Sequence, residues 1–276
     1  MKGLLSLKGN SIEYDGVFDY AIARCYYHLG NLDEQYQTLK QLEPDSHNLT
    51  LQAMNRAAAG DWQAAYQDSR EALRSRESGP NGVKLTPYAT VIAALVDEKL
   101  GNREAWIEFC AQLIPRFERK AFRLRYLLTF LGQRERLPEE LENKAIAIAE
   151  TMASQGTDTK SVHLKTTRIV AGGLAAWRKG RFTEAIELLD RWPYHSNLIP
   201  AAFNHFDQER HVFRAEATQR LLLANCYARL NQIEEAKKQL VLCDEVYEPI
   251  NYDWWAPVIL SNLRAETEEL IQSAEN

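Results

Sequence analysis

The sequence predicts an all-α solenoid built from helical hairpins, and three observations support this prediction. First, one pattern occurs in residues 23–34 and again in residues 224–236: a helix with small and aromatic core residues, a turn at Gly or Asn, and a second helix opened by acids. Second, single Gly residues interrupt helical patterns at further places along the chain. Third, no segment shows the sustained period-two alternation of a strand. Repeated hairpins indicate a solenoid, because each unit buries its apolar face on its neighbours.

Five hairpins are expected, each turning at a Gly or Asn. Their ranges and turn residues are 17–42 at Gly30, 48–74 at Gly60, 87–113 at Gly101, and two more around Gly180 and Asn231. The first hairpin stops before Pro44, since proline disfavours helix in the residue that precedes it. A Gly- and Pro-containing linker at 77–82 separates the second hairpin from the third.

The remaining helices are less regular. Residues 116–156 predict a helical pair, whose second helix opens at Pro138. The last helix, from about 253 to 271, becomes acidic and polar, as suits a terminal cap. We therefore expect one solenoid over residues 1–276, divisible into sub-blocks 1–115 (repeats 1–3), 116–156 (the irregular helical pair) and 157–276 (repeats 4–5 and the cap).

Small residues recur at fixed places around the turns. Those seven positions before a turn are Ala23, Ala53, Ala94, Gly173 and Ala224, and those five positions after a turn are Ala65, Ala185 and Ala236. Small residues let two helices approach closely, and this pattern resembles tetratricopeptide (TPR) repeats. The spacing between turns is uneven, so the repeats are irregular. The resemblance implies a TPR-like solenoid of helical hairpins with a C-terminal capping helix.

A narrower resemblance covers about residues 165–272. The segments that carry it are 178–185 (Arg-Lys-Gly-Arg-Phe-Thr-Glu-Ala), 221–240, 251–255 and 264–271. They resemble the C-terminal TPR region of planctomycete-type bacterial serine/threonine kinases, which implies a bacterial signalling protein. The chain has no Gly-rich phosphate loop, His-Arg-Asp catalytic loop or Asp-Phe-Gly motif, so no kinase activity is implied. We expect no enzyme and no cofactor.

Composition narrows the class of partner and the compartment. The net charge of −5 argues against generic nucleic-acid binding, which needs a basic surface. No apolar run approaches the roughly 20 residues of a membrane-spanning helix. The four Cys lie far apart, and Cys25 and Cys226 take equivalent places in the repeated pattern. They are therefore interpreted as reduced core residues, and the protein as soluble and cytoplasmic.

The TPR resemblance also implies where a partner binds. The first helix of each hairpin lines the concave groove in TPR arrays, which assigns to the partner-binding surface Tyr20, Arg24, Tyr27, His28, Met54, Trp177, Arg178, Asn225 and Arg229. Aromatic and Arg side chains are common anchors of binding energy. Tyr27 and Trp177 could equally be core residues, because irregular repeats blur the register. Arg24 and Arg178 are expected to be exposed and to contribute little to stability.

Two further clusters have competing interpretations. A secondary basic face is formed by Arg116, Arg119, Lys120 and Arg123. It is either a solvated face paired with nearby acids or a docking site for an acidic or phosphorylated segment. The segment 193–214 contains His195, His205, Asp207, Glu209 and His211. A solvated loop or short extra helix is favoured there over a partner contact, and both over a metal site, since no metal-ligand spacing is present.

These observations predict a non-catalytic protein–protein interaction module that binds a peptide or protein in its groove. It would act as the regulatory tail of a larger signalling protein or as a stand-alone adaptor and scaffold. The alternative is a helical sensor that binds a small ligand or short peptide and switches conformation.

Overall fold

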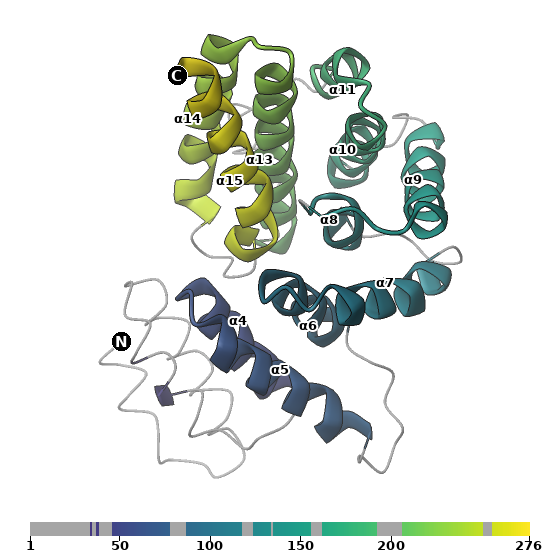
Figure 1. The fold of residues 1–276 in the computed structure, drawn as a ribbon, viewed down its shortest axis with the longest axis vertical. Coiled ribbons are helices and arrows are strands. Elements are labelled where there is room, and N and C mark those ends of the chain that lie inside the picture. Colours follow the sequence, from purple (N-terminus) through teal and green to yellow (C-terminus); the bar gives the residue numbers. More distant parts are fainter. Residues whose placement is uncertain are drawn as a thin grey trace. The chain divides into compact units, whose positions relative to one another are not determined.

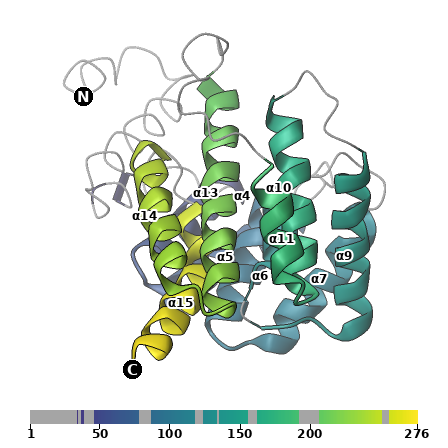
Figure 2. The same ribbon diagram turned by 90° about the horizontal axis from the view of Figure 1, so that it is seen from above.

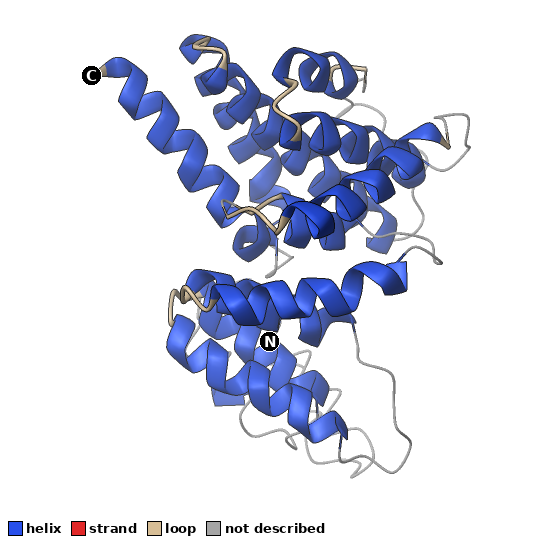
Figure 3. Cartoon of the chain, turned by 45° about the vertical axis from the view of Figure 1, so that its right-hand side comes forward, coloured by secondary structure: helices blue, strands red, loops and turns tan. Residues whose placement is uncertain are grey.

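The computed structural model describes residues 34, 37–38, 46–77, 87–117, 124–133, 135–155, 162–191, 206–250 and 256–276. Within these ranges the chain forms α-helices joined by turns and loops, with no strand (Figure 3). The predicted all-α class is therefore confirmed. The chain divides into two compact units, with the boundary between Phe109 and Cys110.

The first unit contains the second predicted hairpin and the first helix of the third. Helices α4 (Ser46–Ala58) and α5 (Trp62–Glu77) pack on each other, and both contact α6 (Pro87–Lys99). Helix α7 (Arg103–Phe117) follows α6 and crosses the boundary into the second unit. The core of this unit includes Ile92, Leu95 and Trp106, all at most 2% exposed.

The second unit consists of helices that pack on one another (Figures 1 and 2). Its members are α8 (Leu124–Leu131), α9 (Glu139–Ser154), α10 (Val162–Arg178), α11 (Phe182–Leu189), α13 (Phe206–Arg229), α14 (Ile233–Ile250) and α15 (Ala256–Glu275). Helix α10 lies between α9 and α13 and packs on both, while α11 covers the α10–α13 seam. Helix α15 packs on α13 and also contacts α8 and α14. As a result, the last turns of α10 and α13 lie near the middle of α15.

The four predicted turns that fall in the described ranges share one backbone geometry. Gly60, Gly101, Gly180 and Asn231 all have φ between 59° and 81°. In each turn this residue donates its N–H three residues back, and the next residue donates five residues back, as when Arg181 N bonds Ala176 O at 2.9 Å. This is the Schellman motif, which satisfies the last carbonyls of a helix. The carbonyl of the following residue then accepts the first bond of the second helix.

The small residues beside these turns are buried as predicted. Ala53, Ala65, Ala94, Ala185, Ala224 and Ala236 are all 0% exposed. Gly173 shows why the position must be small, because a Cβ built on it would lie 2.5 Å from Cγ of Leu189 on α11. The third hairpin departs from the pattern, since Trp106 takes the place of Ala five residues after Gly101 and is itself 0% exposed.

The cysteine prediction is confirmed for the residues that the structure describes. Cys110, Cys226 and Cys243 are free and buried. Burial raises the pKa of the Cys226 and Cys243 thiols to about 12, so both are protonated and unreactive near neutral pH. Cys25 lies outside the described residues. None of the helices that are described is both long and apolar enough to cross a membrane.

Other predicted segments lie partly or wholly outside the described residues, and the rest can be compared with the structure. Apart from residues 34, 37 and 38, the first hairpin lies outside them, as does the linker after Glu77. The predicted helical pair is present as α8 and α9, with Pro138 at the N-cap of α9. The segment 193–214 is not a single loop, because α13 begins at Phe206. Sub-blocks 116–156 and 157–276 both fall in the second unit.

A buried ion pair joins α5 to α6 in the first unit. Arg70 lies over the rings of Tyr66 and Phe109, each with its centroid 5.0 Å from the guanidinium carbon, and pairs with the fully buried Asp97. Asn102 donates to the other carboxylate oxygen at 3.3 Å. Burial raises the pKa of Asp97 above its ordinary value, and the attraction of Arg70 opposes that rise. Arg70 therefore makes an ionised Asp97 tolerable in the core.

We expect Gly173→Ala to lower the free energy of unfolding by about 1–3 kcal/mol, the usual cost of overpacking a core. The loss should occur even though alanine favours a helix over glycine by about 1 kcal/mol. Leu189 is 0% exposed, so the added methyl group meets a packed side chain. Urea unfolding followed by far-ultraviolet circular dichroism measures the effect.

The neighbouring Gly172→Ala is the matched control, because its Cβ would meet only Ala153 Cβ at 3.1 Å and Leu188 Cδ1 at 3.7 Å. It gains the same helix preference with a milder contact and should remain closer to wild type. A Gly173→Ala variant as stable as wild type would contradict the close approach of α10 and α11.

Replacing Arg70 with Met should destabilise the protein by about 3 kcal/mol near neutral pH, because Asp97 is left charged and buried without its cation. The loss should shrink as the pH falls toward about 4. With Arg70 gone, the pKa of Asp97 rises further, the folded state binds the proton more tightly, and stability falls as pH rises above the ordinary value of 3.8.

Urea unfolding at several pH values tests this, with Arg70→Met/Asp97→Asn as the control that removes the charge. That double variant should recover stability at neutral pH and lose the pH dependence. A loss that does not change with pH would show that Arg70 acts through packing on Tyr66 and Phe109 alone.

Candidate functional site

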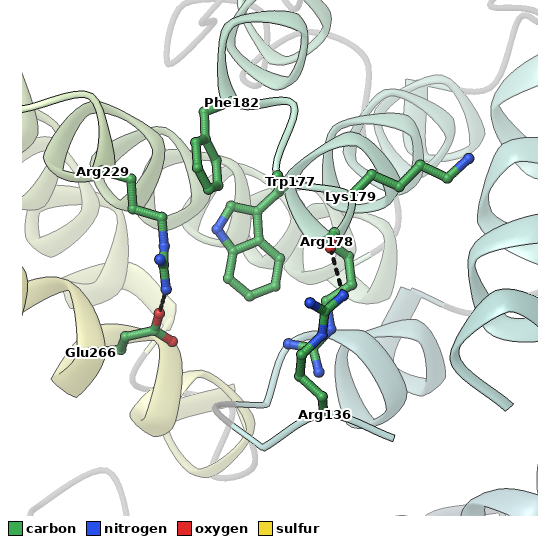
Figure 4. A pocket seen from close by; sticks show the side chains of 8 residues that line it. Arg136, Trp177, Arg178, Lys179, Phe182, Arg229 and Glu266 are labelled. Carbon is green, nitrogen blue, oxygen red and sulfur yellow. Dashed lines mark hydrogen bonds and ion pairs between the residues drawn. The ribbon is translucent and has the colours of Figure 1, made fainter. Parts of the chain in front are cut away.

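A cavity of about 230 Å³ opens beside Trp177 in the second unit, and we name it the Trp177 cavity (Figure 4). Its lining comes from the loop before α9 and from α10, α11, α13 and α15, and consists of Arg136, Trp177, Arg178, Lys179, Gly180, Phe182, Arg229 and Glu266. Four of these side chains are cationic, two are aromatic and one is acidic. The chain as a whole is acidic, with a net charge of −5, so this concentration of cations is local.

The hairpin geometry places these side chains. Trp177 and Arg178 lie in the last turn of α10, directly before the Schellman turn at Gly180. That turn brings Phe182, the first residue of α11, back over the end of α10. Arg229 occupies the equivalent last turn of α13, before Asn231. The same local motif in two successive hairpins thus aims both sets of side chains at one place.

A buried amide connects three helices beneath the cavity. Asn225 on α13 is 0% exposed. Its Oδ1 accepts the indole N–H of Trp177 at 2.7 Å, and its Nδ2 donates to Oγ1 of Thr267 on α15 at 3.0 Å. The hydroxyl of Thr267 in turn donates to the carbonyl of Leu263 at 2.7 Å. This chain of bonds fixes the plane and orientation of the indole ring.

Arg229 is held on three sides. Its Nε donates to Oδ1 of Asn225 at 3.2 Å, its Nη2 pairs with Glu266, and its guanidinium carbon lies 5.5 Å from the ring centroid of Phe182. The side chain is nevertheless 36% exposed. Arg229 is therefore both ordered and accessible from the cavity.

Arg178 is a structural cation at the opposite edge. The residue is only 7% exposed, and its two terminal nitrogens donate to the carbonyls of Gln133 at 3.0 Å and Glu135 at 2.8 Å. Its Nε lies 3.4 Å from Oε1 of Glu142 on α9. Burial lowers the pKa of the Arg178 guanidinium, and the attraction of Glu142 opposes the shift. The prediction that Arg178 is an exposed charge is therefore wrong, because the residue is buried.

Arg136 completes the cationic edge. Its Nε donates to both carboxylate oxygens of Glu142, at 3.0 and 3.2 Å, and its Nη2 donates to the carbonyl of Arg178 at 3.1 Å. The hydrogen bonds to Glu142 raise the pKa of Arg136. The Arg136 side chain is 65% exposed, whereas that of Glu142 is 6% exposed. One buried carboxylate thus anchors two guanidinium groups, one internal and one facing solvent.

The Trp177 cavity continues into two others through shared lining residues. A cavity of about 390 Å³ shares Arg136, Arg178 and Lys179 and extends along α9. Another of about 310 Å³ shares Arg229 and Glu266 and extends along α15 to Ser273. We call the surface lined by these three cavities the Trp177 groove.

Four residues assigned to the partner-binding surface therefore meet at one place. Trp177, Arg178 and Arg229 line the cavity, and Asn225 orients two of them. Met54 lies on α4 in the first unit and is 3% exposed. The other assigned residues, which all belong to the first hairpin, lie outside the described residues: Tyr20, Arg24, Tyr27 and His28.

Sequence reasoning did not assign Phe182, Glu266 or Arg136 to the site. Phe182 directly follows the turn, so the hairpin geometry could have indicated it. Glu266 comes from the capping helix, which lacks a hairpin partner and so lies outside the repeat pattern. Arg136 lies in a loop, where no periodicity exists to place a side chain.

The secondary basic face and the histidine-containing segment remain predictions. Arg116 lies in the last turn of α7, while Arg119, Lys120 and Arg123 fall outside the described residues. Asp207, Glu209 and His211 lie in the first turns of α13, and His195 and His205 fall outside the described ranges. Among the residues that the structure describes, no His, Cys, Asp and Glu side chains gather into a metal-binding group.

Replacing Arg178 with Met should destabilise the protein by roughly 3 kcal/mol, because it removes a buried partner of Glu142 and the donors to two loop carbonyls. Arg181→Met is the control, since Arg181 pairs with Glu150 and Glu184 at 46% exposure and should contribute less than about 1 kcal/mol. Thermal melts of both variants decide the question. Equal melting temperatures for the two variants would show that Arg178 contributes no more to stability than an exposed charge does.

Comparisons of the chain with protein-family models, with curated proteins and with solved structures found no match.

Proposed function

We propose that this chain is a non-catalytic, TPR-like interaction module, an adaptor or regulatory tail that binds a peptide or protein partner in the Trp177 groove. The observation that carries the proposal is the convergence of Trp177, Arg178 and Arg229 on one cavity. These residues come from two different hairpins, and the TPR resemblance assigns each of them to the binding groove. Aromatic and Arg side chains are also the residues that most often dominate binding energy.

The repeat geometry supports the TPR-like part of the proposal. Four turns share one Schellman geometry, and the small residues on either side of them are fully buried. Those positions are the ones on which the resemblance to TPR repeats was based. Free, buried Cys110, Cys226 and Cys243 support a reducing, cytoplasmic setting for such a module.

The shape of the groove supports a macromolecular partner over a small ligand. The Trp177 cavity, at about 230 Å³, is smaller than the roughly 300–1,000 Å³ of pockets that enclose a drug-sized molecule, and the neighbouring cavities, at about 310 and 390 Å³, reach only the lower end of that range. It can receive one side chain, and the neighbouring cavities can receive the residues on either side. A sensor that encloses a whole small ligand would need a larger closed space.

A random-peptide display selection with the full chain as bait tests the proposal. We expect selected peptides to lose about 1 kcal/mol or more of binding free energy with Phe182→Ala, because Phe182 lines the cavity and packs on Arg229. Calorimetry or fluorescence anisotropy with a synthetic copy of a selected peptide measures the change.

The matched control is Val241→Ala, which removes an apolar side chain that is 58% exposed on α14 and lines none of these cavities. It should leave affinity unchanged. Failure to select any peptide, or equal losses in the two variants, would contradict a binding role for the Trp177 groove.

A further inference from the structure

We propose that the Trp177 cavity receives a carboxylate side chain of the partner, with the Arg229 guanidinium as its receptor. This inference rests on the proposed function, since it names the chemistry of the group that enters the groove. It is carried by the hydrogen bonds of Arg229, the charges around the cavity and the rigidity of its floor.

Arg229 has donors available for such a group. A guanidinium carries five N–H donors, and Arg229 uses Nε for Asn225 and Nη2 for Glu266. Its remaining N–H groups have no acceptor among the residues that the structure describes. Because a guanidinium matches a carboxylate with two parallel hydrogen bonds, this open edge is suited to a second carboxylate.

The charges around the cavity fit a monoanion. Arg136, Arg178 and Arg229 surround the floor, while the Lys179 ammonium points away and pairs with Glu150 (Figure 4). Glu142 and Glu266 offset two of the three guanidinium charges. One positive charge is left in excess, which a carboxylate neutralises, whereas a phosphate dianion would be repelled by two nearby acids.

The floor of the cavity makes the receptor ready before the partner arrives. Trp177 is locked by Asn225, and Arg229 is held by Asn225, Glu266 and Phe182. Arginine ordinarily loses side-chain freedom when it binds, so prior ordering lowers that cost. The apolar rings beside the guanidinium also exclude water, which strengthens the charged contact.

Two random decapeptide libraries test the proposal with the full chain. Both are acetylated and amidated, so neither carries a terminal charge, and one of them lacks Asp and Glu. We expect selection from the acid-containing library alone. Replacing the one essential Glu or Asp of a selected peptide with Gln or Asn should weaken binding roughly tenfold or more.

On the protein side, Arg229→Gln should weaken binding of the acidic peptide to a similar degree. Arg229→Lys keeps the positive charge but loses the planar pair of N–H donors, and it should weaken binding less. Arg264→Gln is the control, because Arg264 also lies at an exposed ion pair, is 34% exposed, and lines none of these cavities. Circular dichroism verifies that each variant is folded. The Gln substitution in the peptide tests the same contact without altering the protein.

The outcomes separate this inference from the proposed function. If both libraries yield binding peptides equally well, and Phe182→Ala weakens their binding, the proposal of a bound carboxylate would be overturned. The groove would still be a binding surface. Selection from neither of these libraries, but from a third random library whose peptides end in a free C-terminal carboxylate, would overturn the side-chain assignment. No selection from any library would overturn the proposed function and this inference together.

Discussion

The second unit depends on a single buried amide. Asn225 accepts from Trp177 and Arg229 and donates to Thr267, so one side chain satisfies polar groups from α10, α13 and α15. A buried polar group without partners would cost several kcal/mol, whereas a fully bonded one specifies a unique arrangement. Because the Trp177 ring and the Arg229 guanidinium share this acceptor, the two side chains are fixed relative to each other.

The three arginines of the groove have different structural roles. Arg178 is buried and holds the loop before α9 through two carbonyls, while Arg229 and the largely exposed Arg136 face the cavity. Of the two buried acids, Glu142 pairs with Arg136 and Arg178, and Glu266 pairs with Arg229. The result is a small cationic surface on an acidic chain, ordered by internal pairs rather than by a ligand.

Features that depend on residues close together in the chain could be predicted from the sequence, whereas contacts between distant residues could not. Gly60, Gly101, Gly180 and Asn231 identify their turns because a positive φ favours Gly or Asn, whatever the rest of the chain does. The positions of Trp177, Arg178 and Arg229 beside one cavity could be predicted, because the repeat places equivalent residues on equivalent helix faces. The burial of Arg178 could not be predicted, since it depends on Gln133 and Glu135 in a loop with no periodicity. Glu266 belongs to a helix outside the repeats, so no register related it to Arg229.

The contact between Asn262 and Gln133 has a consequence for the order of folding. The amide of Asn262 on α15 donates to Oε1 of Gln133, after α8, at 2.8 Å, and both residues are buried. They are 129 positions apart in the chain, whereas each hairpin closes through bonds between near neighbours. Hairpins can therefore form while synthesis proceeds, but the ring from α8 to α15 closes only after the last helix has emerged from the ribosome. The groove is thus the last part of the second unit to be assembled, and a chain truncated before α15 would keep its hairpins and lose the side of the Trp177 groove that α15 supplies.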